Sequence, residues 1–206
     1  MNKSEKFWDK MANNYDREEI KDEHTYVNII EKTKKHLKNS DTVLDYGCGT
    51  GLISNEIAYN VKEIYAIDTS SKMIEIAKTK SDGRHIKNID YTHSTIFDER
   101  YKRASFDVIL GFNILHLLED TPKVMHRINE LLKPGGLIIS ATPCLGKKTF
   151  LSILMSLVSK IGLIPNIVSF KISELKSIIS NGNFEIVETE CLRHYSQEYF
   201  IVAKKM

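Results

Sequence analysis

The sequence predicts a doubly wound α/β sandwich built on a mostly parallel sheet. Short apolar segments alternate with helical patterns along the middle of the chain, as in consecutive βαβ units. These segments, such as FDVILGF at 106–112, are nearly continuous in apolar residues, which is typical of strands covered on both faces. A glycine-rich turn, YGCGTG, follows the first of them, and glycine allows a sharp backbone turn.

Size and composition predict one globular domain over residues 1–206. The chain is 42% hydrophobic and 27% charged, with a net charge of +2. That balance permits folding without disulfide or metal staples, and it disfavours a nucleic-acid partner. Three widely spaced cysteines without a CxxC motif predict neither a disulfide framework nor a metal site. The chain begins with no apolar signal segment and contains no run of 18 apolar residues. We therefore expect a cytoplasmic protein without a transmembrane span.

Residues 1–40 predict a helical cap. Apolar side chains that include Trp8 and Tyr15 recur at helical spacing in the polar first 24 residues, which predicts a short docked helix. From Thr25 the apolar positions follow an amphipathic helix. The polar residues 39–41 end that helix.

The alternation that follows predicts five strands and three helices. The expected strands are 42–45, 63–67, 89–92, 106–112 and 137–141. The expected helices are 52–59, 70–80 and 121–132. Proline and glycine in KPGG stop the last helix. Two further strands, 184–191 and 199–203, are separated by a gap short enough for an antiparallel hairpin.

Residues 144–180 predict a helical cover inserted after the fifth strand, because the alternation stops there. Its segment 150–170 is apolar nearly all round. Four interpretations stay open: a lid or pocket wall for an apolar substrate, a buried helix on the sheet, peripheral membrane contact, and a dimer face. Apolarity on all sides indicates burial rather than surface exposure, whereas nearby lysines would help a helix to lie on a membrane surface. The chain is expected to be a monomer or a homodimer.

Two acids flank the glycine turn and indicate its ligand. Asp68 ends the second strand, 21 residues after Gly47, where dinucleotide folds bind ribose hydroxyls. Asp45 stands two residues before Gly47, and its carboxylate would repel a pyrophosphate. A ligand with a cationic amino group gains from Asp45. S-adenosylmethionine (SAM) carries such a group, together with a sulfonium, a ribose and an adenine.

Several motifs then resemble the class I SAM-dependent methyltransferases. VLDYGCGTG resembles their first motif, YAIDTS their ribose-binding acid, and SFDVILGFNILHLLED their fourth-strand motif. LLKPGGLIIS resembles their fifth strand, and FWDKMANNYD an N-terminal segment of small-molecule members. The motifs stand in the family's order over residues 42–141. The resemblance implies a Rossmann-like, seven-stranded sheet in the order 3-2-1-4-5-7-6, with strand 7 antiparallel.

The resemblance also implies roles for individual residues. The turn under the methionine part of SAM is formed by Gly47, Gly49 and Gly51, and Asp45 holds the amino-acid end. Asp68 accepts from the ribose hydroxyls. The other implied cofactor contacts are Tyr15, Cys48, Thr69, Met73, Thr95, Ile96 and Asn113. The family's usual acid after the third strand is missing here, so the adenine contact falls to Thr95 or to Asp98.

The expected function is methyl transfer from SAM to a small-molecule acceptor that is apolar or lipid-like. Catalysis rests mainly on positioning, because the sulfonium is already an activated leaving group. His116 is the candidate general base, and a packing or capping role is its alternative. A non-catalytic scaffold and an NAD-dependent oxidoreductase remain as other classes. The GxGxG turn and Asp45 disfavour the oxidoreductase.

Overall fold

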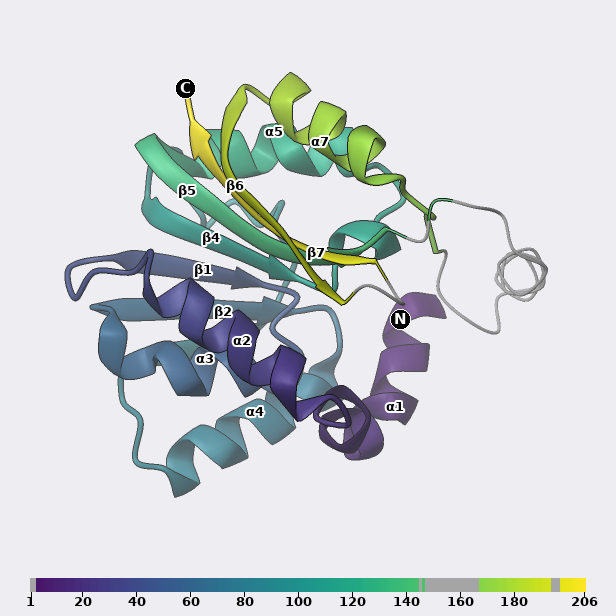
Figure 1. Ribbon diagram of the computed structural model, residues 1–206. Coiled ribbons are helices and arrows are strands. Elements are labelled where there is room, and N and C mark those ends of the chain that lie inside the picture. The colour runs from purple at the N-terminus through teal and green to yellow at the C-terminus, as the bar shows by residue number, and fades with distance from the viewer. Residues whose placement is uncertain (1–2, 145, 147–166, 194–196) are drawn as a thin grey trace.

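The structure is a computed structural model that describes residues 3–144, 146, 167–193 and 197–206. A seven-stranded sheet lies between helices on both faces (Figure 1). The strand order is β3-β2-β1-β4-β5-β7-β6, and β7 runs antiparallel to both of its neighbours. The predicted fold class and strand order are confirmed.

The elements follow the predicted alternation. The strands are β1 (Thr42–Tyr46), β2 (Glu63–Asp68), β3 (Ile89–His93), β4 (Phe106–Phe112), β5 (Leu132–Pro143), β6 (Phe184–Arg193) and β7 (Glu198–Lys205). The α-helices are α1 (Lys3–Glu19), α2 (Glu23–Lys34), α3 (Leu52–Ile57), α4 (Ser71–Gly83), α5 (Thr121–Leu131) and α7 (Ile172–Asn181). Short 3-10 turns follow α3 and β4, at Ala58–Asn60 and Leu115–Leu117.

Successive strand residues feed two separate cores, as the period of two requires. In β1, Val43 packs with α3 and α4 on one face, whereas Leu44 packs with α5 and α7 on the other. Both side chains are fully buried. The near-continuous apolar strands are therefore explained by helices on both sides of the sheet (Figure 1).

Several boundaries differ from the predictions. Leu132 already pairs with Phe106, so β5 begins directly after α5 rather than at residue 137. Helix α5 ends at Leu131, and the KPGG segment lies within β5, where Gly135 has a left-handed φ and the pairing register with β4 shifts. The predicted helix 52–59 ends at Ile57 and continues as a 3-10 turn. The last hairpin is longer than predicted at both inner ends, reaching Arg193 and Glu198.

The structure describes only part of the predicted cover at 144–180. Helix α7 (Ile172–Asn181) forms the end of this segment. Residues 147–166 lie outside the described residues, and the lid, membrane and dimer interpretations of 150–170 fall mainly on them. Among the described residues, no helix has both the length and the apolarity needed to cross a bilayer.

Candidate active site

Helix α1 lies across the carboxyl ends of the parallel strands (Figure 1), and two of its carboxylates fasten it to loops there. Asp9 accepts from the Ser70 hydroxyl at 2.6 Å and from a backbone N–H in the first turn of α4. Asp16 accepts from the Thr50 hydroxyl and from Lys80 Nζ, the latter at 2.8 Å. These contacts tie α1 to the loops that follow β1 and β2.

The two ends of α1 contact the outer loops. Near its start, Glu5 lies 3.7 Å from His93 Nε2 at the end of β3. In its last turn, Glu19 accepts from Asn113 Nδ2 at 3.2 Å, directly after β4. One carboxylate of α1 therefore contacts the chain at or after the carboxyl end of each of the strands β1, β2, β3 and β4, and these contacts hold α1 across that edge of the sheet.

The glycine turn is folded against the end of β2. The backbone N–H groups of Gly47 and Cys48 both donate to the Ile67 carbonyl, at 2.9 and 3.0 Å. The Gly49 N–H donates to Asp68 Oδ2 at 3.0 Å. Left-handed φ angles at Gly47 and Gly49 permit this path. The result is a narrow turn in which Gly47 and Gly49 border a cavity.

Asp68 is oriented by two backbone donors. Besides Gly49, the Ser70 N–H donates to its other oxygen at 2.8 Å. Burial raises the pKa of Asp68, and these two hydrogen bonds oppose the rise. A carboxylate has about four acceptor positions, so two bonds leave capacity for a ligand's hydroxyl groups. Asp68 thus fits a ribose.

Asp45 is almost completely buried at the end of β1, with 3% of its surface exposed. The Ser54 hydroxyl donates to it from α3. Burial raises its pKa to about 6, and the Ser54 hydrogen bond opposes the rise. The group remains mostly ionised at neutral pH and would gain from a cationic ligand.

Two adjoining cavities open beneath α1. The Asp68 cavity has a volume of about 190 Å³, and the Asp45 cavity about 310 Å³. Both cavities are lined by Trp8, Tyr15, Gly47, Phe112, Asn113 and Leu117. A ligand longer than either cavity can therefore occupy both.

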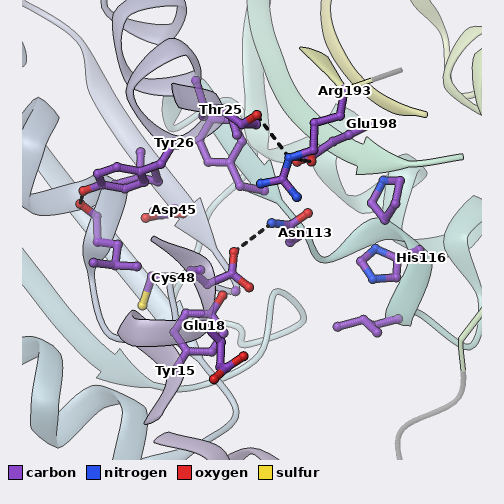
Figure 2. Close-up of a pocket in the computed structure, with 18 of the residues that line it drawn as sticks. Tyr15, Glu18, Thr25, Tyr26, Asp45, Cys48, Asn113, His116, Arg193 and Glu198 are labelled. Atoms are coloured by element: carbon purple, nitrogen blue, oxygen red, sulfur yellow. Dashed lines mark hydrogen bonds and ion pairs between the residues drawn. The ribbon is translucent and has the colours of Figure 1, made fainter. Parts of the chain in front are cut away.

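Charged side chains line the Asp45 cavity, where Arg193 lies beside Glu198 and Glu18 lies near Tyr15 (Figure 2). Glu18 and Glu19 come from the end of α1, and Arg193 and Glu198 come from the β6–β7 hairpin. Burial raises the pKa of Glu19 and of Glu198, and the charge of Arg193 opposes both shifts.

His116 lies in the 3-10 turn after β4 and lines the Asp45 cavity. Burial lowers its pKa to about 4, so the ring is uncharged at neutral pH. Its Nδ1 is buried and has no hydrogen-bond partner in the described part of the chain. An unpaired buried nitrogen is costly.

Most of the residues proposed from the sequence meet at these cavities. The Asp68 cavity is lined by Tyr15, Gly47, Gly49, Asp68, Thr69, Met73 and Asn113. The Asp45 cavity is lined by Tyr15, Asp45, Gly47, Cys48, Asn113 and His116. Burial raises the pKa of the Cys48 thiol well above its usual value, so Cys48 stays a small neutral residue in the wall.

Gly51, Thr95 and Ile96 line neither cavity. Gly51 lies at the start of α3. Thr95 is exposed, and its hydroxyl accepts from a backbone N–H two residues on. Ile96 is buried in a core, with 1% of its surface exposed. Asp98 lines neither cavity; it pairs with Arg100 and accepts from the Ser94 hydroxyl at 2.9 Å. Ser94 lines the Asp68 cavity instead.

The sequence alone does not reveal the charged side chains that line the Asp45 cavity. Glu19, Arg193 and Glu198 belong to no motif, and each stands at the end of its element. Glu198 carries a weak signal, because it is a charge directly before the apolar run 199–203. Nothing in the local sequence marks Glu19 or Arg193.

A family model described as a methyltransferase domain matches residues 37–198. The chain belongs to this methyltransferase family. It is a SAM-dependent methyltransferase, and SAM is its cofactor. The methyltransferase is 30% identical over 171 residues to a ubiquinone biosynthesis O-methyltransferase of Rickettsia bellii. That match covers 80% of this chain and 70% of the relative.

Solved structures share the methyltransferase's fold at low sequence identity. A SAM-dependent methyltransferase from Thermotoga maritima has a TM-score of 0.72 at 19% identity, covering 98% of this chain and 100% of that one. Another from Aquifex aeolicus has a TM-score of 0.67 at 18% identity, covering 86% and 89%. These likenesses support the architecture described above.

Proposed function

We propose that the methyltransferase methylates a small molecule that binds in the Asp45 cavity, with SAM spanning both cavities. The adenosine part would occupy the Asp68 cavity, with its ribose hydroxyls on Asp68 and its adenine beside Thr69 and Met73. The observation that carries this proposal is the pair of adjoining cavities at the strand ends. One of them is lined by the Asp68 carboxylate, which two backbone N–H groups orient. Ligands of open α/β sheets bind at this edge.

The remaining cofactor contacts would come from the glycine turn and from α1. A side chain at Gly47 or Gly49 would place its Cβ 3.0 Å from Ile114 or 3.1 Å from Tyr15. The turn therefore needs glycine to stay this close to its neighbours. The negative charge of Asp45 favours the cationic part of SAM, and Tyr15 and Asn113 border both cavities. Residues 1–40 would then act as the cap of the site.

SAM supplies a methyl group on a positively charged sulfur, which is already a good leaving group. The protein's part is to hold the acceptor in line with that sulfur, and positioning of this kind contributes up to roughly 7–11 kcal/mol in ideal cases. Phe112, Leu117 and Pro143 offer an apolar wall for the acceptor's body. His116, as a neutral imidazole, is suited to hydrogen-bond a hydroxyl, whereas its lowered pKa makes it a weak acceptor of the hydroxyl's proton.

A hydroxyl acceptor is supported by the Rickettsia relative, which is named an O-methyltransferase of ubiquinone biosynthesis. The apolar wall also fits an aromatic or lipid-like body. The charges of this cavity add a requirement: with Glu19 and Arg193 facing each other's charge, Glu18 and Glu198 remain to repel an anionic acceptor. We therefore propose a neutral or cationic acceptor with an apolar body.

Calorimetric titration with S-adenosylhomocysteine, the demethylated product of SAM, tests the placement of the cofactor. We expect binding to the wild type, and Asp68→Asn should weaken it about 10- to 100-fold, because hydrogen bonds to a charged group are lost. Asp82→Asn, an exposed carboxylate on α4, is the matched control. Unchanged affinity in Asp68→Asn, or binding of NAD in place of the sulfur ligand, would refute the proposal.

A further inference from the structure

Arg193 is the single Lys or Arg side chain in the described wall of the Asp45 cavity. Carboxylates of Glu18, Glu19, Asp45 and Glu198 line the same cavity. This cavity therefore offers both signs of charge within one space, and that pattern complements a ligand that carries an ammonium and a carboxylate together.

The guanidinium of Arg193 is held by its Nε. This atom lies 2.7 Å from Asp22 Oδ2, 3.1 Å from the Thr25 hydroxyl and 3.5 Å from Glu198 Oε2. In Figure 2 the two terminal nitrogens of Arg193 point into the cavity, toward Asn113. Terminal guanidinium nitrogens bind a carboxylate with two parallel hydrogen bonds. Arg193 is thus oriented in advance for an anionic group.

Glu19 approaches the same space from α1. Its carboxylate accepts from Asn113 Nδ2 at 3.2 Å, and Asn113 borders both cavities. Burial raises the pKa of Glu19, and the charge of Arg193 works against that rise. The two side chains are therefore close enough to interact, and a bound ammonium would stabilise the ionised form of Glu19.

We infer that Arg193 and Glu19 bind the amino-acid end of SAM, with the guanidinium on its carboxylate and Glu19 on its ammonium. This inference rests on the proposed function, which puts adenosine in the Asp68 cavity and leaves the amino-acid end for the Asp45 cavity. Asp45 and Gly47 line the same cavity. The end of α1 and the β6–β7 hairpin, which are far apart in the sequence, then both contact the amino-acid end of SAM.

Two ligands that differ only in this group test the assignment. S-adenosylhomocysteine and 5′-methylthioadenosine share the adenosine and the thioether, and only the first carries the amino acid. We expect Arg193→Met and Glu19→Gln each to raise the calorimetric Kd of S-adenosylhomocysteine about 10- to 100-fold. The Kd of 5′-methylthioadenosine should stay unchanged in both variants.

Matched controls lie elsewhere on the surface. Arg84→Met removes an arginine that pairs with Glu56, and Glu31→Gln removes a carboxylate that pairs with Lys34. Neither should change the Kd of either ligand. Because Arg193→Met also removes the partner of Asp22, a thermal melt accompanies it. Glu19→Gln keeps an acceptor for Asn113 and so gives a second, milder test.

Three outcomes separate the possibilities. The inference is overturned if Glu19→Gln and Arg193→Met weaken both ligands equally, or if they weaken neither. It is also overturned if the variants leave the Kd of S-adenosylhomocysteine unchanged and raise only the KM of an acceptor that carries an amino-acid group, because Arg193 and Glu19 would then bind the acceptor. Failure of the wild type to bind either ligand would instead refute the proposed function.

Discussion

Gly51 illustrates how one residue shapes the glycine turn without touching the cavities. Its φ of +73° lies in the left-handed region, and an added Cβ would stand 2.3 Å from the Tyr91 hydroxyl. Tyr91 is buried and hydrogen-bonds Asn55 Oδ1 at 3.2 Å in α3. The turn can therefore reach α3 only through a residue that has no side chain.

Replacement of Gly51 should destabilise the protein. We expect Gly51→Ala to lower the free energy of unfolding by about 1–3 kcal/mol, because it adds backbone strain and a contact with Tyr91. Urea denaturation followed by circular dichroism measures the loss. Gly83→Ala is the control, since nothing lies within 4 Å of a Cβ there. Equal stability of the two variants would contradict the role given to Gly51.

At the scale of elements, α1 depends on its contacts with the rest of the molecule. Only Ala12 is buried along its 17 residues, and polar residues dominate its sequence. Isolated helices of this length are marginal in water. Trp8 packs edge-on against Phe7 and Tyr15, with ring centroids 5.1 and 6.2 Å apart. The aromatic rings and the carboxylates together hold α1 over the cavities.

Loosening α1 should weaken ligand binding and leave the sheet intact. We expect the double variant Asp9→Ala, Asp16→Ala to speed amide hydrogen exchange in residues 3–19 about tenfold, because each loss frees a charged hydrogen bond. The Kd of S-adenosylhomocysteine should rise in parallel. Trp8 is the sole tryptophan of the chain, so its emission reports the same change.

Arg17→Ala provides the control for α1, because Arg17 is on the same helix and 74% of its side chain is exposed. It should leave exchange and emission as in the wild type. Unchanged exchange in the double variant would show that the contacts of Asp9 and Asp16 do not hold the helix in place.

At the scale of the whole molecule, several titratable groups lie at the carboxyl edge of the sheet, and folding shifts their pKa values. His116 has a lowered pKa of about 4, whereas Asp45 has a raised pKa of about 6. Between pH 4 and 6.5 the unfolded chain binds more protons at His116 than the folded protein does. Acidification through this window therefore removes stability at His116. At Asp45 the folded state binds more protons, so the effect has the opposite sign.

The His116 contribution can be isolated by a difference measurement. We expect the free energy of unfolding of the wild type, minus that of His116→Gln, to fall by up to about 3 kcal/mol as the pH drops from 6.5 to 4. Urea denaturation at intervals across this range measures it, and the shifts of the carboxyl groups cancel in the difference. A flat difference would mean that His116 keeps its ordinary pKa.

Local patterns in the sequence were sufficient for most of the fold. The period of apolar residues, the KPGG stop and the glycine turn each act within a few residues, so they identify strands and helices directly. Motif resemblance then supplied the strand order, which the structure confirms. The same short-range logic brings Asp45, Asp68 and Gly47 together, because the ends of adjacent parallel strands meet at one edge of the sheet.

The family resemblance, the sheet and the motif residues at its carboxyl edge can thus be predicted from local sequence patterns. Such patterns do not predict that Thr95 and Ile96 line neither cavity, or that Glu19 and Arg193 line one of them. These positions depend on contacts between segments that are far apart in the sequence. Contacts with the chain after β1, β2, β3 and β4 fix the position of α1. The length of the β6–β7 hairpin depends on the pairing of β7 with β5 and β6.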